Sequence, residues 1–293
     1  METSSAPVPK PARDHSRPGQ PADAGFSRVD LLTVIGVLVL LGLLLTPALA
    51  RTRVTDQAFQ CRNNLRQLLN AWRMYAEDNS DKVPSAWANA GDWWPVGEMS
   101  WTGNATTDGK NAYNWNSEIT IKQSPLWPYC GSSQEIWRCP SDTIYSCIPT
   151  NGLFQGQFVP RVRSYSMNSW FNAADAALFG PGYTIYKRIG DCLKPGPAMT
   201  FVFLDERADS INDGELSTEM FGWDPYQPTS WAVADVPANC HGGACGFAFV
   251  DGHSESHQWR DILLTVRMGH GPNIPAYNSK DAYWLMEHAT RKP

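Results

Sequence analysis

The first 80 residues pass from a polar stretch to an apolar one and then to an amphipathic one. Residues 1–24 are polar and contain five prolines and three basic residues, so they cannot build a core and are predicted to form a disordered leader. Residues 31–50 carry no charge, and a helix of this length spans a hydrocarbon layer of about 30 Å. Because Lys10, Arg13 and Arg17 precede this segment, the pattern predicts a cytoplasmic N-terminus.

From residue 51 onward, apolar side chains recur at the spacing of one helical face, with polar side chains on the other. The helix is therefore predicted to continue from the apolar segment through 51–82 and to end near Asp78, before Pro84. At a rise of about 1.5 Å per residue, the stretch from Leu31 to Asp78 is about 72 Å long. The apolar positions of the amphipathic half are Val54, Ala58, Cys61, Leu65, Leu68, Leu69, Trp72 and Tyr75.

The helical period is lost beyond Pro84. Residues 83–293 are rich in Trp, Gly and Pro, which predicts one α+β unit of long loops and short strands without an internal repeat. The clearest element is a β-hairpin, with a strand at 246–250, a two-residue type I′ turn at Asp251-Gly252 and a return strand at 253–259. The predicted fold is a long N-terminal helix packed on an antiparallel sheet.

Composition and motifs exclude several classes of function. The net charge is −5 and no basic stretch is present, so nucleic acid is not an expected partner. The chain has no phosphate-binding or dinucleotide-binding glycine loop and no Gly-x-Ser-x-Gly nucleophile turn. We therefore expect a protein without enzymatic activity.

The segment Gly-Phe-Ser-Arg-Val-Asp-Leu-Leu at 25–32 resembles the prepilin cleavage motif of type IV pilins and type II secretion pseudopilins. The resemblance implies that a prepilin peptidase cuts after Gly25 and methylates the new N-terminus at Phe26. Asp30 would then be the fifth mature residue and would pair with the N-terminal amine of a neighbouring subunit. An acidic side chain at that depth is costly in lipid, which makes it a candidate for a functional role. Pro47 falls where many type IV pilins carry a helix-kinking proline.

Two other interpretations of this segment remain. Ala48-Leu49-Ala50 satisfies the small-x-small rule of a secretory signal peptide, although the apolar stretch is longer than such peptides usually have. The segment also has the length of an ordinary transmembrane anchor.

His241, nine residues and then Asp251-Gly252 resemble the H-X9-DG motif, which defines a C-terminal domain found with prepilin-type N-termini in planctomycete and verrucomicrobial bacteria. Further fragments of the chain resemble the same family, at 61–67, 75–79, 139–142 and 164–168. The resemblance implies a cleaved leader (1–25), a transmembrane and assembly helix (26–50), its amphipathic continuation (51–82) and a globular domain (83–293) that includes the motif hairpin (241–259).

The resemblance also implies a location and partners. The protein would be a single-pass inner-membrane protein with a cytoplasmic N-terminus and a periplasmic C-terminal domain, and later part of an envelope filament or the cell surface. Its partners would be the prepilin peptidase, other pilin-like subunits and a pilus or secretion assembly platform. No cofactor is required, although Ca²⁺ bound by Asp- and Asn-rich loops is an alternative.

Histidines and cysteines leave several chemical interpretations open. His241, His253, His257 and Asp205 are candidate metal ligands, but we expect His241 to be a hydrogen-bonded brace of the hairpin or of the loop beside Asp251. If the domain is exported, disulfides are the expected use of the cysteines that lie close in sequence, and Cys61 is the one expected to stay unpaired. The cysteines expected in disulfides are Cys139, Cys147, Cys240 and Cys245.

Two functions from other classes remain as alternatives. Tryptophans between residues 87 and 127 suit stacking on sugar rings, so the chain could be an envelope-anchored carbohydrate-binding protein. A metallohydrolase would require His241, His253 and an acid to converge on an open site.

Overall fold

The computed structural model describes residues 27–87, 92–143, 146–267, 269 and 273–293, and for 44–54 it describes only the backbone. The chain divides into two units, Met1–Leu49 and Ala50–Pro293. Helix α1 (Arg28–Asp78) contributes to both. The expected processing residues Gly25 and Phe26 lie outside the described residues.

Helix α1 begins with a capping box. The Ser27 N–H donates to Asp30 Oδ2 at 2.8 Å, and the Asp30 N–H donates to Ser27 Oγ at 3.2 Å, so each residue satisfies the other's backbone donor. Within the described part of the chain, we find no helix that is both long enough and apolar enough to cross a membrane. Between Val29 and Leu41, the large apolar side chains of α1 are 47–70% exposed. They are Val29, Leu31, Leu32, Val34, Ile35, Val37, Leu38, Val39, Leu40 and Leu41.

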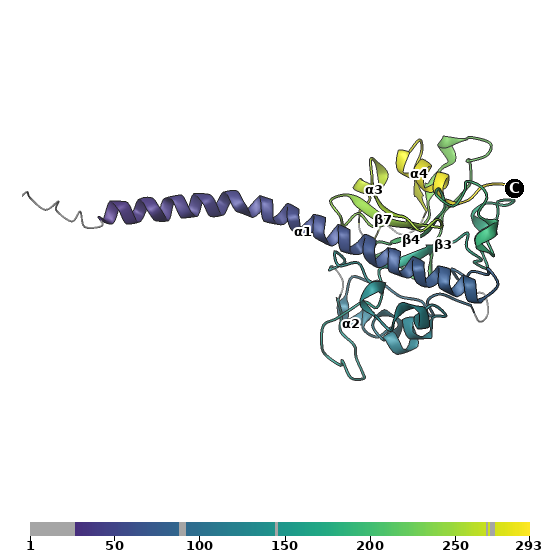
Figure 1. Ribbon diagram of the computed structural model, residues 1–293, viewed down its shortest axis with the longest axis horizontal. Helices are drawn as coiled ribbons and strands as arrows, with labels where there is room; N and C mark the ends of the chain where they lie inside the picture. The colour runs from purple at the N-terminus through teal and green to yellow at the C-terminus, as the bar shows by residue number, and fades with distance from the viewer. Residues whose placement is uncertain (1–26, 88–91, 144–145, 268, 270–272) are drawn as a thin grey trace, which may run out of the picture. The chain divides into compact units, whose positions relative to one another are not determined.

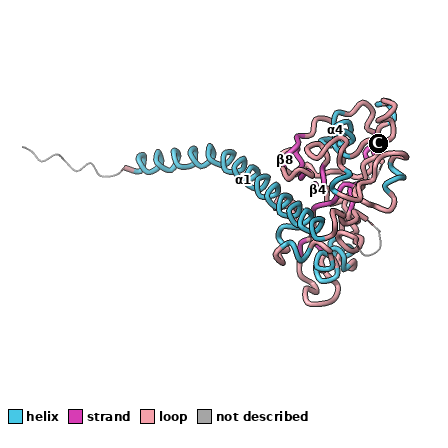
Figure 2. Tube along the Cα trace, turned by 45° about the vertical axis from the view of Figure 1, so that its right-hand side comes forward, coloured by secondary structure: helices cyan, strands magenta, loops and turns pink. Residues whose placement is uncertain are grey.

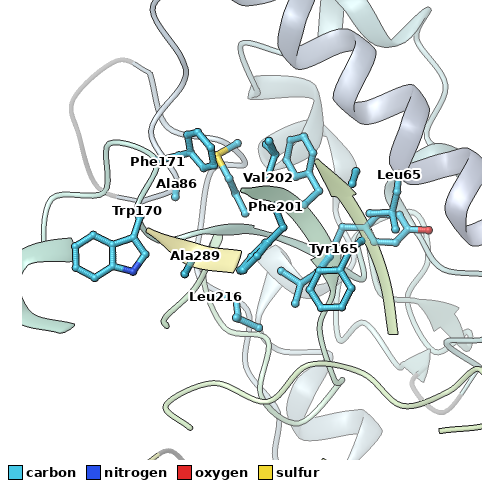
Figure 3. Close-up of a cluster of buried hydrophobic side chains, with 14 of the residues drawn as sticks. Leu65, Ala86, Tyr165, Trp170, Phe171, Phe201, Val202, Leu216 and Ala289 are labelled. Atoms are coloured by element: carbon cyan, nitrogen blue, oxygen red, sulfur yellow. The ribbon is translucent and has the colours of Figure 1, made fainter. Parts of the chain in front are cut away.

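The second half of α1 confirms the predicted apolar stripe from Cys61 onward. Its stripe residues are at most 8% exposed: Cys61, Leu65, Leu68, Leu69, Trp72 and Tyr75. Leu65 lies in one buried cluster with Tyr165 and Phe201 of the sheet (Figure 3). The helix ends at Asp78, as predicted, and the chain leaves it through left-handed backbone at Ser80 and Asp81.

The central sheet has five strands in the order β5-β3-β4-β7-β8. Three of them, β3, β4 and β7, are labelled in Figure 1. Three of the sheet's four strand pairs are antiparallel, but β5 runs parallel to β3, so the prediction of an antiparallel sheet is corrected to a mixed one. A parallel neighbour requires a long connection, and residues 169–214 between the two strands supply it. The strands are β3 (Tyr165–Asn168), β4 (Phe201–Asp205), β5 (Glu215–Leu216), β7 (Ala244–Phe249) and β8 (Ser254–Gln258).

Helices cover both faces of β7. A Cβ placed on Gly246 would lie 2.8 Å from Leu65 of α1, whereas the next residue, Phe247, packs edge-on against Trp284 of helix α4 (Lys280–Ala289), with ring centroids 4.6 Å apart. Because successive side chains point to opposite faces, β7 lies between the second half of α1 and α4. All six β7 residues are therefore buried, which explains their continuous apolar run.

Loops and short helices make up most of the remaining globular unit (Figure 2). The short strands pair antiparallel as β1 (Ser146–Cys147) with β2 (Val159–Pro160), and β6 (Ala232–Val233) with β9 (Ile274–Pro275). The short α-helices are α2 (Ala105–Asp108) and α3 (Ile262–Thr265). The described 3-10 helices are η1 (Ala112–Asn114), η2 (Ser117–Ile119), η3 (Ile121–Gln123), η4 (Trp127–Cys130), η5 (Glu135–Trp137), η6 (Ala176–Phe179), η7 (Ile189–Asp191) and η8 (Pro228–Ser230).

The predicted hairpin forms between β7 and β8, with a different turn. The Gly252 N–H donates to the Phe249 carbonyl and the Phe249 N–H to the His253 carbonyl, both at 2.9 Å, so three residues form the loop instead of two. Gly252 has a φ of 107°, while Asp251 is not in the positive-φ region. A type I′ turn needs positive φ at both of its central residues, so the prediction of that turn is wrong.

Candidate metal centre

Four side chains from segments far apart in sequence converge in the globular unit. Cys61, Cys139, Asp205 and His241 each place one potential ligand atom so that all four atoms lie within 4.8 Å of one another. All four residues are buried. The Cys61 Sγ lies 2.9 Å from Asp205 Oδ2, and the His241 Nε2 lies 3.2 Å from both the Cys139 Sγ and Asp205 Oδ2.

Helix α1 and strand β4 bring two of these residues together. Cys61 belongs to the buried stripe of α1, and Asp205 is the last residue of β4. The Gly246 N–H donates to Asp205 Oδ2 at 3.2 Å. A Cβ on Gly246 would lie 2.8 Å from Leu65 and 3.1 Å from both the Asp205 carboxylate and the Cys61 sulfur, so only glycine leaves the cluster its space.

A glycine turn positions the histidine. Gly242 and Gly243 have φ values of 67° and 85°, and this backbone turns the chain into β7 directly after His241. The His241 Nδ1 lies 3.2 Å from Ser141 Oγ, and that hydroxyl donates in turn to Gln57 Oε1 at 3.4 Å. Because the hydroxyl proton is used for Gln57, the Ser141 oxygen accepts from Nδ1–H, which leaves Nε2 as the nitrogen that faces the cluster.

The cluster has unusual electrostatics. Burial raises the pKa of Asp205 to about 7. Burial also opposes protonation of His241, but hydrogen bonds with Asp205 and Cys139 outweigh it and raise the pKa of the imidazole to about 10. Hydrogen bonds from Cys240 and Cys61 hold the pKa of Cys139 well below its ordinary value, whereas burial raises the pKa of Cys61 well above its own. Three acidic groups and one base, all with shifted pKa values, thus lie at one buried point.

The structure brings together only two of the four residues that the sequence suggested as metal ligands. Asp205 and His241 meet, but His253 instead contacts Asp251 through its Nδ1 at 2.6 Å, on the exposed hairpin loop. His257 stacks on Trp284, with ring centroids 3.9 Å apart. The ring of His241 bonds Cys139, Ser141 and Asp205, none of which belongs to the hairpin or to the loop beside Asp251, so the expected brace of either is corrected.

The cysteines also differ from expectation. All seven are free thiols, so the expected disulfides among Cys139, Cys147, Cys240 and Cys245 are absent. Cys139 lies close to Cys240, with sulfurs 3.8 Å apart, and Cys147 lies on β1 and is buried. Proximity in sequence was a poor guide, because the loops bring Cys139 to a residue 101 positions away.

Cys61 and Cys139 are the ligand-type residues that sequence reasoning missed. Both lie in fragments that carry the family resemblance, at 61–67 and 139–142, and His241 opens the segment that resembles the H-X9-DG motif. Two thiols and an imidazole lie in three fragments that resemble motifs of one family, and this was a signal that the three fragments share a site.

The clefts of the globular unit and its tryptophans lie outside the cluster of four ligand-type residues. A cleft of about 580 Å³ borders Trp115, Leu153 and Phe154, and a groove of about 340 Å³ borders Tyr226 and Trp284; none of the four cluster residues lines either.

All 13 tryptophans of the chain are among the described residues, and none of them is exposed. Those that are fully buried are Trp72, Trp94, Trp137, Trp170, Trp231 and Trp259.

Comparison of the chain with protein-family models, with curated proteins and with solved structures found no match. What the cluster binds therefore has to be inferred from its own ligand atoms.

Proposed function

We propose that this chain is a pilin-like subunit of the cell envelope. A prepilin peptidase cuts after Gly25 and methylates Phe26, and the first half of α1 anchors the subunit in the inner membrane with the unit Ala50–Pro293 on the periplasmic side. The same helix then joins those of related subunits in a pilus or a type II secretion-like filament, on an assembly platform. The protein acts without catalysis.

The observation that carries this proposal is the exposed apolar surface of α1 between Val29 and Leu41. Large aliphatic side chains cover the helix there and are about half exposed or more. Soluble monomers rarely leave a contiguous apolar surface of this kind in water. Lipid tails before assembly, and the helices of neighbouring subunits afterwards, would each bury it. The prepilin-like motif at 25–32 directly precedes this surface and supports the same function.

The burial of the tryptophans supports a structural globular unit. Within 87–127, the stretch suggested for sugar stacking, Trp94 is buried and the other tryptophans are at least partly covered. Trp94 stacks on Trp137 and meets Phe203 edge-on, which is the packing of a core.

One observation favours the carbohydrate-binding alternative at another place. The groove beside α4 presents the exposed rings of Tyr226 and Tyr283 next to Glu287 and Lys280, a combination of aromatic faces and polar groups that suits sugars. If this alternative holds, Tyr226→Ala abolishes binding of the chain to a glycan array. Equal binding by the variant and the wild type removes this site.

Processing tests the proposed function. We expect the mature protein from native membranes to begin with N-methylated Phe26, and Gly25→Val to keep the leader because the peptidase requires the small residue before the cut. Gly36→Val is the matched control, since a Cβ at Gly36 meets no other atom within 4 Å. It should be processed like the wild type. Intact mass and N-terminal sequencing measure both.

Other results would contradict the proposal. A mature N-terminus at Arg51 would indicate a secretory signal peptide, and an uncut chain in the presence of an active prepilin peptidase would indicate a plain anchor.

A further inference from the structure

We propose that Cys61, Cys139, Asp205 and His241 bind one zinc ion in a closed structural site. The inference goes beyond the pilin-like function and is independent of it, because all four ligands belong to the unit Ala50–Pro293.

The distances fit a tetrahedral ion. Zinc binds sulfur at about 2.3 Å and nitrogen or oxygen at about 2.0–2.2 Å, so the ligand atoms of a regular site are about 3.3–3.8 Å apart. The Cys139 Sγ, Asp205 Oδ2 and His241 Nε2 are already spaced close to this, at 3.2 Å for each contact of the imidazole. The contact of 2.9 Å between Cys61 Sγ and Asp205 Oδ2 needs to open by about 0.7 Å to reach the sulfur-to-oxygen spacing of such a site.

The ligand types select the metal. Two thiols and an imidazole are soft and borderline donors that suit zinc, whereas Ca²⁺ takes six to eight oxygen ligands. Only Asp205 contributes oxygen, so the Ca²⁺ that the loops suggested does not fit this cluster. In proteins, buried charged groups are generally paired with an opposite charge or bound to a metal. Bound zinc would balance two of the three negative charges of the Asp205 carboxylate and the Cys61 and Cys139 thiolates.

Neighbouring groups hold the ligands in place. Ser141 accepts from His241 Nδ1–H and leaves Nε2 for the ion. The Gly246 N–H bonds the Asp205 carboxylate, and the Tyr165 hydroxyl donates to the Cys61 sulfur at 3.5 Å. Hydrogen bonds of this kind orient metal ligands and are costly to remove.

The site would link four parts of the globular unit. Cys61 lies on α1, Cys139 follows η5, Asp205 ends β4 and His241 precedes β7. With four protein ligands, all of them buried, no position remains for water or substrate, which is the arrangement of a structural site and not of a hydrolase. The ion would join helix and sheet where a disulfide would join only two segments.

Metal content tests the inference in the full-length chain purified in detergent without chelators. We expect close to one equivalent of zinc in the wild type, and only background levels in Cys61→Ser and His241→Gln. The matched control is Cys192→Ser, which also removes a buried thiol but lies outside the cluster. It should keep its zinc. Chelation should lower the Tm of the wild type and of this control, and should leave the Tm of Cys61→Ser unchanged.

A second measurement uses the wild type alone and so does not depend on the variants folding. After replacement of zinc by Co²⁺, tetrahedral thiolate ligation gives intense visible bands and a sulfur-to-cobalt charge-transfer band.

Three outcomes overturn the inference. The first is a wild-type chain that takes up neither zinc nor cobalt, and the second is a Cys61→Ser variant that keeps its zinc. The third is a native chain that contains no metal and whose intact mass is lower by two hydrogen atoms because Cys139 and Cys240 form a disulfide. These two thiols would then be a redox pair. A mature N-terminus at Arg51 would contradict the pilin-like function and leave this inference standing.

Discussion

The two halves of α1 share the backbone conformation of an α-helix, but the apolar side chains of the first half are exposed and those of the second half are buried. Between Val29 and Leu41 the apolar side chains surround the helix and remain exposed, whereas between Cys61 and Ala76 they form one stripe and are buried against the globular unit. A helix that is apolar on all sides requires an apolar environment, and a helix with a stripe requires one partner surface. The pattern thus distinguishes a half that is exposed among the described residues, for which we propose a partner outside the chain, from a half that packs on the chain itself.

The difference also decides where chemistry can be placed. In the covered half, the stripe carries Cys61 into contact with Asp205, beside Tyr165. In the other half, the hydrogen bonds of the Asp30 carboxylate within the described part of the chain are to the neighbouring Ser27. Packing holds a side chain against residues far away in sequence, while an exposed helix offers only the contacts of its own turns.

Matched leucine truncations should separate the two halves most strongly. Leu65→Ala removes a fully buried side chain and should lower the free energy of unfolding of the globular unit by about 2–5 kcal/mol. Leu38→Ala makes the same chemical change where the side chain is 62% exposed, and should leave that free energy unchanged. Urea denaturation of the full chain in detergent, followed by tryptophan fluorescence, measures both. Equal losses would refute the difference in packing.

Glycine substitutions should show the same contrast with a smaller effect. Gly246→Ala places a methyl group 2.8 Å from Leu65 and 3.1 Å from Cys61 and Asp205, and should cost about 1–3 kcal/mol and weaken zinc binding. Gly36→Ala meets nothing within 4 Å and should favour its helix by about 0.5–1 kcal/mol. Thermal unfolding and metal content measure the first, and helical circular dichroism the second. A Gly246→Ala variant as stable as the wild type would mean that Leu65, Cys61 and Asp205 can shift to accommodate the methyl group without loss of stability.

Gly252→Val tests the solvent side of the covered half. The φ of 107° strains a β-branched residue, and a Cβ there would lie 2.7 Å from the Arg73 guanidinium of α1. We expect a loss on the order of 1 kcal/mol or more in the free energy of unfolding. In an Arg73→Ala background the part of the loss due to the collision should disappear and the part due to backbone strain should remain. If Arg73→Ala restores the full stability, the backbone contributes nothing.

Periodicity predicted the parts of the fold that depend on near neighbours. The stripe of α1, its end at Asp78 and the β7–β8 hairpin follow from local spacing and turn residues. The three-residue hairpin loop was missed because its hydrogen bonds, and not the pair Asp251-Gly252, set the turn type. The parallel pairing of β5 with β3 was also missed, since a two-residue strand leaves almost no pattern and its partner is chosen by tertiary packing.

The candidate site was only half visible in the sequence. His241 and Asp205 were named because their side chains commonly bind metals, and His253 and His257 were named for the same reason. Nothing local distinguishes the first pair from the second: convergence depends on how β4 ends and how the glycine turn enters β7. Cys61 was named as a stripe residue and as an unpaired cysteine but not as a ligand, although its place in the stripe was the clue that it faces the interior.

Asp30 offers the smallest and most specific test, because its carboxylate has a local role and a proposed intermolecular one. Ser27→Ala removes one capping bond and should destabilise the first turn of α1 by about 0.5–2 kcal/mol while keeping the charge, so subunits should still assemble. Asp30→Asn keeps an oxygen for the Ser27 N–H but removes the charge that would pair with the amine of Phe26 in a neighbour. It should be cleaved and remain in the membrane, yet fail to assemble in a crosslinking assay, and the unfolding of the globular unit should not change in either variant. If Asp30→Asn assembles like the wild type while Ser27→Ala does not, Asp30 acts as a helix cap, and a contact other than its pairing with the Phe26 amine aligns neighbouring subunits.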